Sequence, residues 1–132
     1  MNILFFLTAK EKVAHVDESN SVRQVLEKMK YYGYTAVPLL DKEGHYLGTV
    51  TEGDLLWALW QGNNFNIKDT EKINICEIKR GRDNEAVNIY ADMHSLLNLA
   101  LRQNFVPVVD DRQMFIGIVT RKDIIAYFAE KK

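Results

Sequence analysis

Two short motifs in the sequence pair a threonine with an aspartate three residues later, Thr51-x-x-Asp54 and Thr120-x-x-Asp123. Such a pair can form a capping box, in which the hydroxyl caps the first helical turn and the acid complements the helix dipole. The same carboxylate can instead accept hydrogen bonds from the vicinal hydroxyls of a ribose, as an acidic residue does in dinucleotide-binding folds. The two roles are compatible, because a helix N-terminus also attracts phosphate. Both readings stay open on these residues alone.

Other residues that could carry chemistry are sparse. The three histidines, His15, His45 and His94, stand at spacings that do not suit a metal site. Cys76 is the single cysteine, which excludes an intrachain disulfide and fits a reducing cytoplasm. No Ser-His-Asp or Cys-His set and no Gly-rich phosphate loop is evident. We therefore expect that the protein is not an enzyme and that it holds neither a metal nor a catalytic cofactor.

Composition narrows the class of protein further. The chain has 132 residues, 47% of them hydrophobic, which suits one ordinary domain or two very small ones packed together. Seventeen basic residues balance 18 acidic ones, so neither a general nucleic-acid binder nor a polybasic membrane protein is favoured. The apolar run Ile3 to Leu7 is too short for a signal peptide or a membrane span. We expect this run to be buried against the fold.

An internal repeat organises the chain. Its landmarks are a proline-containing apolar strand, a second strand that begins near a glycine, and the threonine motif. They occur first as Pro38-Leu-Leu-Asp41, Gly48-Thr-Val-Thr51 and Asp54, and 69 residues later as Pro107-Val-Val-Asp110, Gly117-Ile-Val-Thr120 and Asp123. Further upstream, Val13 to Val16 matches Ala86 to Ile89 at an offset of 73. The difference between the offsets of 73 and 69 predicts that the helix between these landmarks is about one turn shorter in the second copy.

Local patterns predict the same elements in both copies. Val22, Val25, Leu26 and Met29 follow a helical stripe, Ser21 and Gln24 resemble a capping box, and Gly33 suits the helix end. Strands are predicted at 35–40 and 46–50, with a second helix opening at Thr51. The second copy repeats this order with a helix through 96–101, strands at 105–109 and 115–119, and a helix through 124–128. The predicted class is α+β, with two β-α-β-β-α repeats.

These elements define the expected domain organisation. Residues 1–11 form an apolar N-terminal segment, 12–60 the first repeat and 85–132 the second repeat. Residues 61–84 form a polar linker, with Gly62-Asn63-Asn64 as its breaker. A unit of ~50 residues buries too little apolar area to be stable alone, so the two copies are expected to pack together.

The order of elements and the repeated motifs resemble a tandem CBS-domain pair, also called a Bateman module. The resemblance covers the chain from about Lys12 to Phe128. A narrower likeness, to the small stand-alone CBS proteins of Firmicutes that bind cyclic di-AMP, is carried by Lys12-Val-Ala-His-Val16, Gly33-Tyr-Thr-Ala-Val-Pro38, Asn104-Phe-Val106 and Phe115-Ile-Gly-Ile-Val-Thr-Arg121. The resemblance implies a pseudo-two-fold module that binds adenosine-containing ligands between its repeats and regulates rather than catalyses.

The resemblance also implies two candidate sites, each made from the early strands of one repeat and the threonine-motif helix of the other. Site A comprises Lys12, Val13, Ala14, Tyr34, Thr35, Ala36, Val37, Thr120, Arg121, Lys122 and Asp123. Site B comprises Glu85, Val87, Asn104, Phe105, Val106, Thr51, Glu52, Gly53 and Asp54. In site A the small residues Ala14 and Ala36 would let an adenine lie close to the backbone, unless they are simply core alanines.

Charge distinguishes the two sites. Site A gathers Lys12, Arg121 and Lys122 towards one helix start, where they would contact phosphate, although charges there can also be merely solvated. The corresponding positions of site B are Glu85, Glu52 and Gly53, and like charges would repel a phosphate. We therefore predict that site A is the main phosphate-bearing site and that site B is weaker or empty.

The leading functional hypothesis is a cytoplasmic, non-catalytic module that binds AMP, ADP, ATP or cyclic di-AMP and signals to an unidentified partner protein. The alternative is a dimeric CBS scaffold that acts without a ligand. Trp57 and Trp60 crowd one helix with Leu56 and Leu59, which fits either a core or an oligomer face. Because CBS pairs commonly dimerise through such helices, a homodimer is expected.

Overall fold

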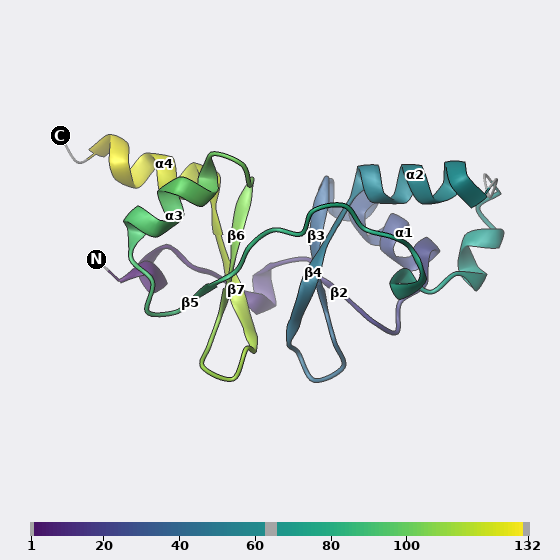
Figure 1. Cartoon of the computed structure of the whole chain (residues 1–132), viewed down its shortest axis with the longest axis horizontal. Coiled ribbons are helices and arrows are strands. Elements are labelled where there is room, and N and C mark those ends of the chain that lie inside the picture. Colours follow the sequence, from purple (N-terminus) through teal and green to yellow (C-terminus); the bar gives the residue numbers. More distant parts are fainter. Residues whose placement is uncertain (1, 63–65, 131–132) are drawn as a thin grey trace. The chain divides into compact units, whose positions relative to one another are not determined.

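The structure, a computed structural model, describes residues 2–62 and 66–130, so the predicted breaker residues Asn63 and Asn64 lie outside the described residues. The chain divides into two compact units, which are coloured along the sequence in Figure 1. The first-repeat unit comprises Ala14–Asp83, and the second-repeat unit comprises Met1–Val13 with Asn84–Lys132. Each unit packs helices against a small sheet, which confirms the predicted α+β class. No helix in the described part of the chain is long and apolar enough to cross a membrane.

The first-repeat unit is built on a three-stranded sheet in the order β2-β3-β4. Its elements run β2 (Val16–Asp17), α1 (Val22–Tyr32), β3 (Ala36–Leu40), β4 (Tyr46–Thr51), α2 (Glu52–Gly62), η3 (Asp69–Lys72) and η4 (Ile75–Glu77). β2 and β3 are parallel and are therefore joined by a crossover helix, α1. β3 and β4 are antiparallel and are joined by a tight turn.

Helix α1 begins and ends where the sequence predicts. Ser21 Oγ accepts the Gln24 backbone N–H at 3.1 Å, and the Gln24 side chain accepts the Ser21 N–H at 2.8 Å, which completes a capping box. Gly33 ends the helix in the left-handed region at φ 72°. Val22, Val25 and Met29 face the core, as the helical stripe predicts.

The segment after α2 contributes to the first-repeat core. Ile75 is fully buried beside Val22 and Leu39, and Ile73 packs against the same cluster. Two backbone hydrogen bonds hold this segment at the start of α1, from Val22 N–H to Ile73 O at 2.8 Å and from Ile75 N–H to Asn20 O at 2.9 Å. The second half of the predicted linker is thus packed and hydrogen-bonded within this unit.

The second-repeat unit has a four-stranded sheet in the order β1-β7-β6-β5. Its elements are η1 (Ile3–Phe6), β1 (Thr8–Ala9), η2 (Lys10–Lys12), β5 (Val87–Asn88), α3 (Met93–Ala100), β6 (Phe105–Val109), β7 (Phe115–Thr120) and α4 (Arg121–Glu130). The sheet includes β1, although β1 precedes the first repeat in the sequence. Ile3 is fully buried in this core, and the Phe6 ring packs edge-on against Tyr127, so the N-terminal apolar run is buried in part.

The glycine of strand β7 permits the pairing with β1. Ala9 pairs with Gly117, and Thr8 pairs with Ile118. A Cβ atom on Gly117 would lie 2.2 Å from the Thr8 carbonyl oxygen, and the backbone there has φ 154°. No side chain larger than hydrogen fits, because real Cβ atoms do not approach backbone oxygens so closely.

Two details of the predicted repeat are wrong. Val16 pairs with Leu39 and Val87 with Val108, so the first strands correspond at an offset of 71 rather than 73. A shift of two residues leaves the same side chains on the same face of a strand, so the apolar pattern alone cannot separate the two alignments. In addition, helix α3 ends at Ala100, and Leu101 follows it as an exposed cap.

We expect Gly117→Ala to lower the free energy of unfolding by about 2 kcal/mol, because the methyl group collides with Thr8 and strains the backbone. Gly53→Ala is the matched control, since a Cβ there meets nothing closer than 3.7 Å. Because Gly53 lies in helix α2, that change should be neutral or slightly stabilising. Urea denaturation followed by circular dichroism measures both, and equal stabilities would contradict the assigned contact.

Candidate functional site

Each unit ends its β-hairpin at the start of a helix. In the first-repeat unit Ala36 pairs with Thr51, and Thr35 O accepts the Glu52 N–H at 3.0 Å. Tyr34 to Val37 therefore lie beside the threonine motif of their own repeat. At this end of the hairpin, which lies opposite the turn, a strand meets the N-terminus of a helix.

The second-repeat unit has the same arrangement. Phe105 pairs with Thr120, Val106 pairs with Val119, and Asn104 O accepts the Arg121 N–H at 2.9 Å. Asn104, Phe105 and Val106 thus lie beside the start of α4, and β5 with Val87 lies on the far side of β6.

The predicted site residues are distributed over both units. Site A takes Ala14 and 34–37 from the first-repeat unit, and Lys12, Val13 and 120–123 from the second-repeat unit. Site B takes Thr51 and Asp54 from the first-repeat unit, and Val87, Phe105 and Val106 from the second. Each half lies within its own unit, and the assembly of two halves into one site stays a prediction.

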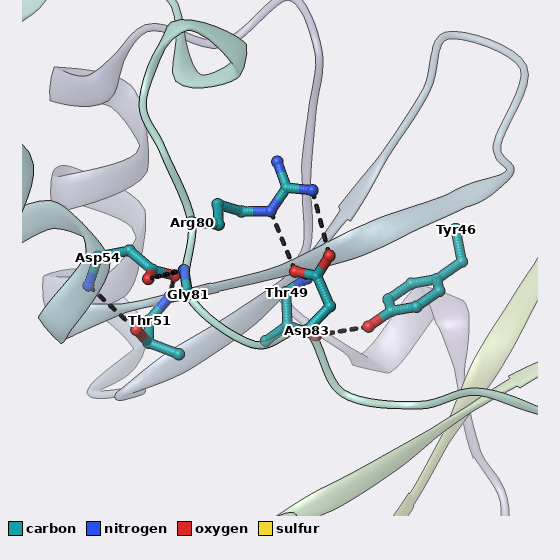
Figure 2. A network of polar contacts seen from close by, with 7 residues as sticks. All are labelled: Tyr46, Thr49, Thr51, Asp54, Arg80, Gly81 and Asp83. Carbon is teal, nitrogen blue, oxygen red and sulfur yellow. Dashed lines mark hydrogen bonds and ion pairs between the residues drawn. The ribbon is translucent and has the colours of Figure 1, made fainter.

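The two aspartates of the repeated motif have different surroundings. Asp54 is buried, with 9% of its surface exposed, and Figure 2 shows both carboxylate oxygens engaged. Oδ2 accepts the Thr51 N–H at 3.0 Å, and Oδ1 accepts the Gly81 N–H at 2.7 Å. The Thr51 hydroxyl accepts the Asp54 N–H at 3.1 Å, which completes a capping box. At this copy the capping role is present, and a backbone N–H from the linker is added to it.

Of this arrangement, Asp123 has only the hydrogen bond between its backbone N–H and the threonine hydroxyl. Its backbone N–H donates to the Thr120 hydroxyl at 3.2 Å. Its carboxylate accepts no hydrogen bond and forms no ion pair with residues 2–62 or 66–130, and the side chain is half-buried. A carboxylate at a helix N-terminus with unused lone pairs can accept hydroxyl donors.

Arg121, at the first position of α4, is held by one nitrogen. Its Nε donates to Ala100 O at 2.8 Å and to Gln103 O at 3.0 Å, which satisfies the last carbonyl of α3 and a carbonyl of the loop that follows it. The two terminal nitrogens of the guanidinium make no hydrogen bond with the described residues. An arginine fixed in this way keeps a free fork that suits a phosphate.

A buried glutamine that the sequence analysis did not select organises the same region. Gln103 has 5% of its surface exposed, and its Oε1 accepts the Glu85 N–H at 2.8 Å. Its Nε2 donates to Glu85 O and Phe105 O, both at 3.1 Å. Gln103 thus connects the strand start, the loop before β5 and Arg121. The sequence does not single out Gln103, because its neighbours Arg102 and Asn104 are also polar and nothing marks which of the three is buried.

The other half of site A presents aromatic and small side chains. Tyr34 is 44% exposed, and its ring stacks on Tyr32 with centroids 5.9 Å apart and planes 8° apart. Gly33, in the left-handed region, turns the chain between the two rings. Ala14 and Val37 are buried, and Ala36 is half-buried. The described residues contain no cluster of three His, Cys, Asp or Glu side chains that could hold a metal ion.

The sequence analysis also missed the linker residues that lie along strand β4. Asp83 Oδ1 accepts the Thr49 N–H at 2.9 Å, and Arg80 binds the same carboxylate at 3.1 Å (Figure 2). This ion pair raises the pKa of the Arg80 guanidinium above its usual value. Beside it, burial raises the pKa of Tyr46 to about 12, and the Tyr46 hydroxyl pairs with the Thr49 hydroxyl. The only sequence signal was a run of charges that also suits an exposed linker.

With both units in view, comparisons with known proteins identify the class. A model of the CBS domain family matches residues 7–61 and 82–130, and the chain belongs to this family. The resemblance to a tandem CBS-domain pair is confirmed.

Individual relatives refine the comparison. The chain is 25% identical over 120 residues to cyclic di-AMP receptor B of Bacillus subtilis, covering 91% of this chain and 81% of that protein. Among solved structures, CbpB in complex with c-di-AMP has a TM-score of 0.86 at 24% identity, covering 98% of this chain and 85% of that one. CBSX2 in complex with AMP has a TM-score of 0.76 at 24% identity, with coverages of 99% and 98%. These structures establish the fold. Three further relatives are longer proteins, of which the chain spans 20, 42 and 21%.

We expect Asp54→Ala to cost about 2 kcal/mol of unfolding free energy, because it leaves the Thr51 and Gly81 N–H groups without their charged acceptor. Asp123→Ala, at the equivalent position of the second repeat, should cost about 0.5 kcal/mol, since no donor in the described part of the chain binds that carboxylate. Urea denaturation of both variants measures the difference. Equal losses would show that the two carboxylates do the same structural work.

Proposed function

We propose that the protein is a non-catalytic regulatory module that binds an adenine nucleotide at site A, formed by the two CBS repeats. The observation that carries this proposal is the contrast between the two threonine motifs. Asp123 and the terminal nitrogens of Arg121 have no partners among the described residues, and both stand in the first turn of α4. A free carboxylate and a free guanidinium at one helix start fit a ribose next to a phosphate.

In this proposal each group of site A has a chemical role. Asp123 accepts hydrogen bonds from the ribose hydroxyls, and Arg121 and Lys122 neutralise phosphate, with Lys12 adding a further positive charge. Thr120 caps the helix and thereby holds Asp123 in place. On the first-repeat half, Ala14 and Ala36 leave room for adenine, Val37 contributes apolar surface, Tyr34 an aromatic ring and Thr35 a hydroxyl donor. Val13, from the second-repeat unit, adds further apolar surface. Site B, with Val87, Phe105, Val106, Thr51 and Asp54, is the weaker site.

The ligand belongs to the adenine nucleotides. AMP, ADP, ATP and cyclic di-AMP all present adenine, ribose and phosphate, which are the groups that site A addresses. Two of these ligands are named with relatives of this chain, cyclic di-AMP for cyclic di-AMP receptor B and CbpB, and AMP for CBSX2. Binding would favour one packing of the repeats over another, and an unidentified partner protein would read that difference.

Exposed apolar side chains on α2 support a homodimer as the form of the module. Leu56 and Trp57 are 56 and 60% exposed. A groove of about 410 Å³ lies between α1 and α2, lined by Leu26, Met29, Lys30, Glu52, Leu55, Leu56 and Leu59. An apolar surface of this kind is expected to be covered by another protein surface, for which a second copy is the simplest choice. The same surface supports the alternative, a dimeric scaffold that recruits its partner without any nucleotide.

The role of Arg121 predicts a difference between ligands. Isothermal titration should show that Arg121→Ala weakens AMP or cyclic di-AMP by about 10- to 100-fold and leaves adenosine within about twofold, because the phosphate is the only part of the ligand that Arg121 contacts in this proposal. Asp123→Asn should weaken adenosine as well. Arg112→Ala is the control for charge, since its side chain is exposed in the β6–β7 turn of the same unit. Equal losses for phosphorylated ligands and adenosine would refute the role of Arg121, and no binding of any of these ligands by the parent protein would refute the function.

The dimer proposal has its own test. Leu56→Glu with Trp57→Glu should convert the protein to monomers in sedimentation velocity, because the charges cannot be buried at an apolar interface. Leu101→Glu is the control, since this leucine is 81% exposed in the second-repeat unit. A protein that sediments as a monomer before any change, or a dimer that survives the double change, would contradict the assigned surface.

A further inference from the structure

The linker closes over the start of α2 in the first-repeat unit. We call residues Arg80 to Asp83 the strap. Its Gly81 N–H donates to Asp54 at 2.7 Å, and its Asp83 carboxylate accepts the Thr49 N–H at 2.9 Å. Arg80 binds the two Asp83 oxygens at 3.1 and 3.3 Å, which ties the two ends of the strap together (Figure 2). The strap is thus held to the unit at two points, and its own ends are joined to each other.

Strand β4 is shaped to receive the strap. A Cβ atom on Gly48 would lie 2.5 Å from the Asp83 carboxylate, so only glycine leaves room for that group. Thr49, the residue that donates to Asp83, is 1% exposed. The Thr49 N–H has a charged acceptor at a buried position, where a hydrogen bond lost without replacement is costly. These features give the strap one preferred position.

The second repeat provides an internal comparison. Gly117 corresponds to Gly48, and Thr120 and Asp123 correspond to Thr51 and Asp54. The segment that covers Gly117 is β1, which pairs through its backbone with Gly117 and Ile118. No backbone N–H reaches the Asp123 carboxylate from the described residues. Both glycines are therefore covered by a segment from outside their repeat, but only Asp54 receives a donor from it.

We propose that the strap is a built-in occupant of the Thr51 and Asp54 half of site B, so that the chain binds a single nucleotide. The Gly81 N–H takes the position on the carboxylate that a ribose hydroxyl would need, and it arrives covalently linked, without the entropy cost of a free ligand. The residues that determine the number of bound nucleotides are then Gly81 and Asp83, more than the acids Glu52 and Glu85. This inference rests on the proposed nucleotide function.

The test counts bound AMP per chain in a variant with the strap released. Gly81→Pro removes the N–H that Asp54 accepts, and Asp83→Ala removes the acceptor of Thr49. The matched control, Gly81→Ala with Asp83→Asn, keeps both groups, and a Cβ on Gly81 would make only an ordinary 3.4 Å contact with Asp54. By equilibrium dialysis we expect one AMP per chain for the parent and the control, and a second AMP for the released variant. Adding Asp54→Asn should abolish the second AMP.

Hydrogen exchange of the unmodified protein gives an independent measurement, which holds even where the released variant does not fold. The Thr49 and Gly81 amides should exchange slowly, and saturating AMP should leave their rates unchanged within about twofold. Faster exchange of these amides with AMP would overturn the proposal, because the strap would then give way to the nucleotide. A second AMP on the parent protein would overturn it as well. So would a folded released variant that binds one AMP when the parent protein also binds one.

The same experiments separate this proposal from the proposed function. If the parent protein binds no AMP and the released variant binds one that depends on Asp54, the strap proposal stands and nucleotide binding at site A is refuted. If the parent protein binds one AMP that depends on Asp54 rather than on Asp123, the strap proposal fails while nucleotide binding stands.

Discussion

The close approach of an outside segment to a strand glycine is the contact on which both units depend. At Gly117 the segment is β1, whose carbonyl oxygen occupies the space where a Cβ would stand. At Gly48 it is the carboxylate of Asp83. Each segment precedes the other repeat in the sequence, so neither repeat is complete with its own residues alone.

The difference between these two contacts sets the difference between the two carboxylates. A paired strand such as β1 uses its backbone groups on β7, and none of its N–H groups reaches the Asp123 carboxylate. The strap instead reaches the start of α2 and donates a backbone N–H to Asp54. The two motifs have the same residue types but differ in role. Asp54 has a structural role, and the Asp123 carboxylate is available as an acceptor.

Much of the fold could be predicted because its signals are local. The capping box of Ser21 and Gln24, the left-handed Gly33 and the strand from Phe105 to Val109 each depend on residues a few positions apart. The strand alignment was harder, since a shift of two residues keeps Val16 on the same face and is decided only by pairing with β3. Gln103 and the strap could not be predicted, because their partners lie 18 to 34 residues away among side chains of similar polarity.

The sequence by itself determined the repeat, the α+β class, the family and the residue types at both candidate sites, because each is carried by a residue pattern of short range. Only the tertiary structure decided which of the two aspartates is already in use. Burial and hydrogen bonding depend on which distant segment reaches a carboxylate. The residues of Thr51-x-x-Asp54 and Thr120-x-x-Asp123 carry no information about that segment. The two threonine motifs, which the charges of Glu52 and Arg121 already distinguish, therefore differ in a second physical respect. The Gly81 N–H binds the Asp54 carboxylate, and no backbone N–H of the described residues binds that of Asp123.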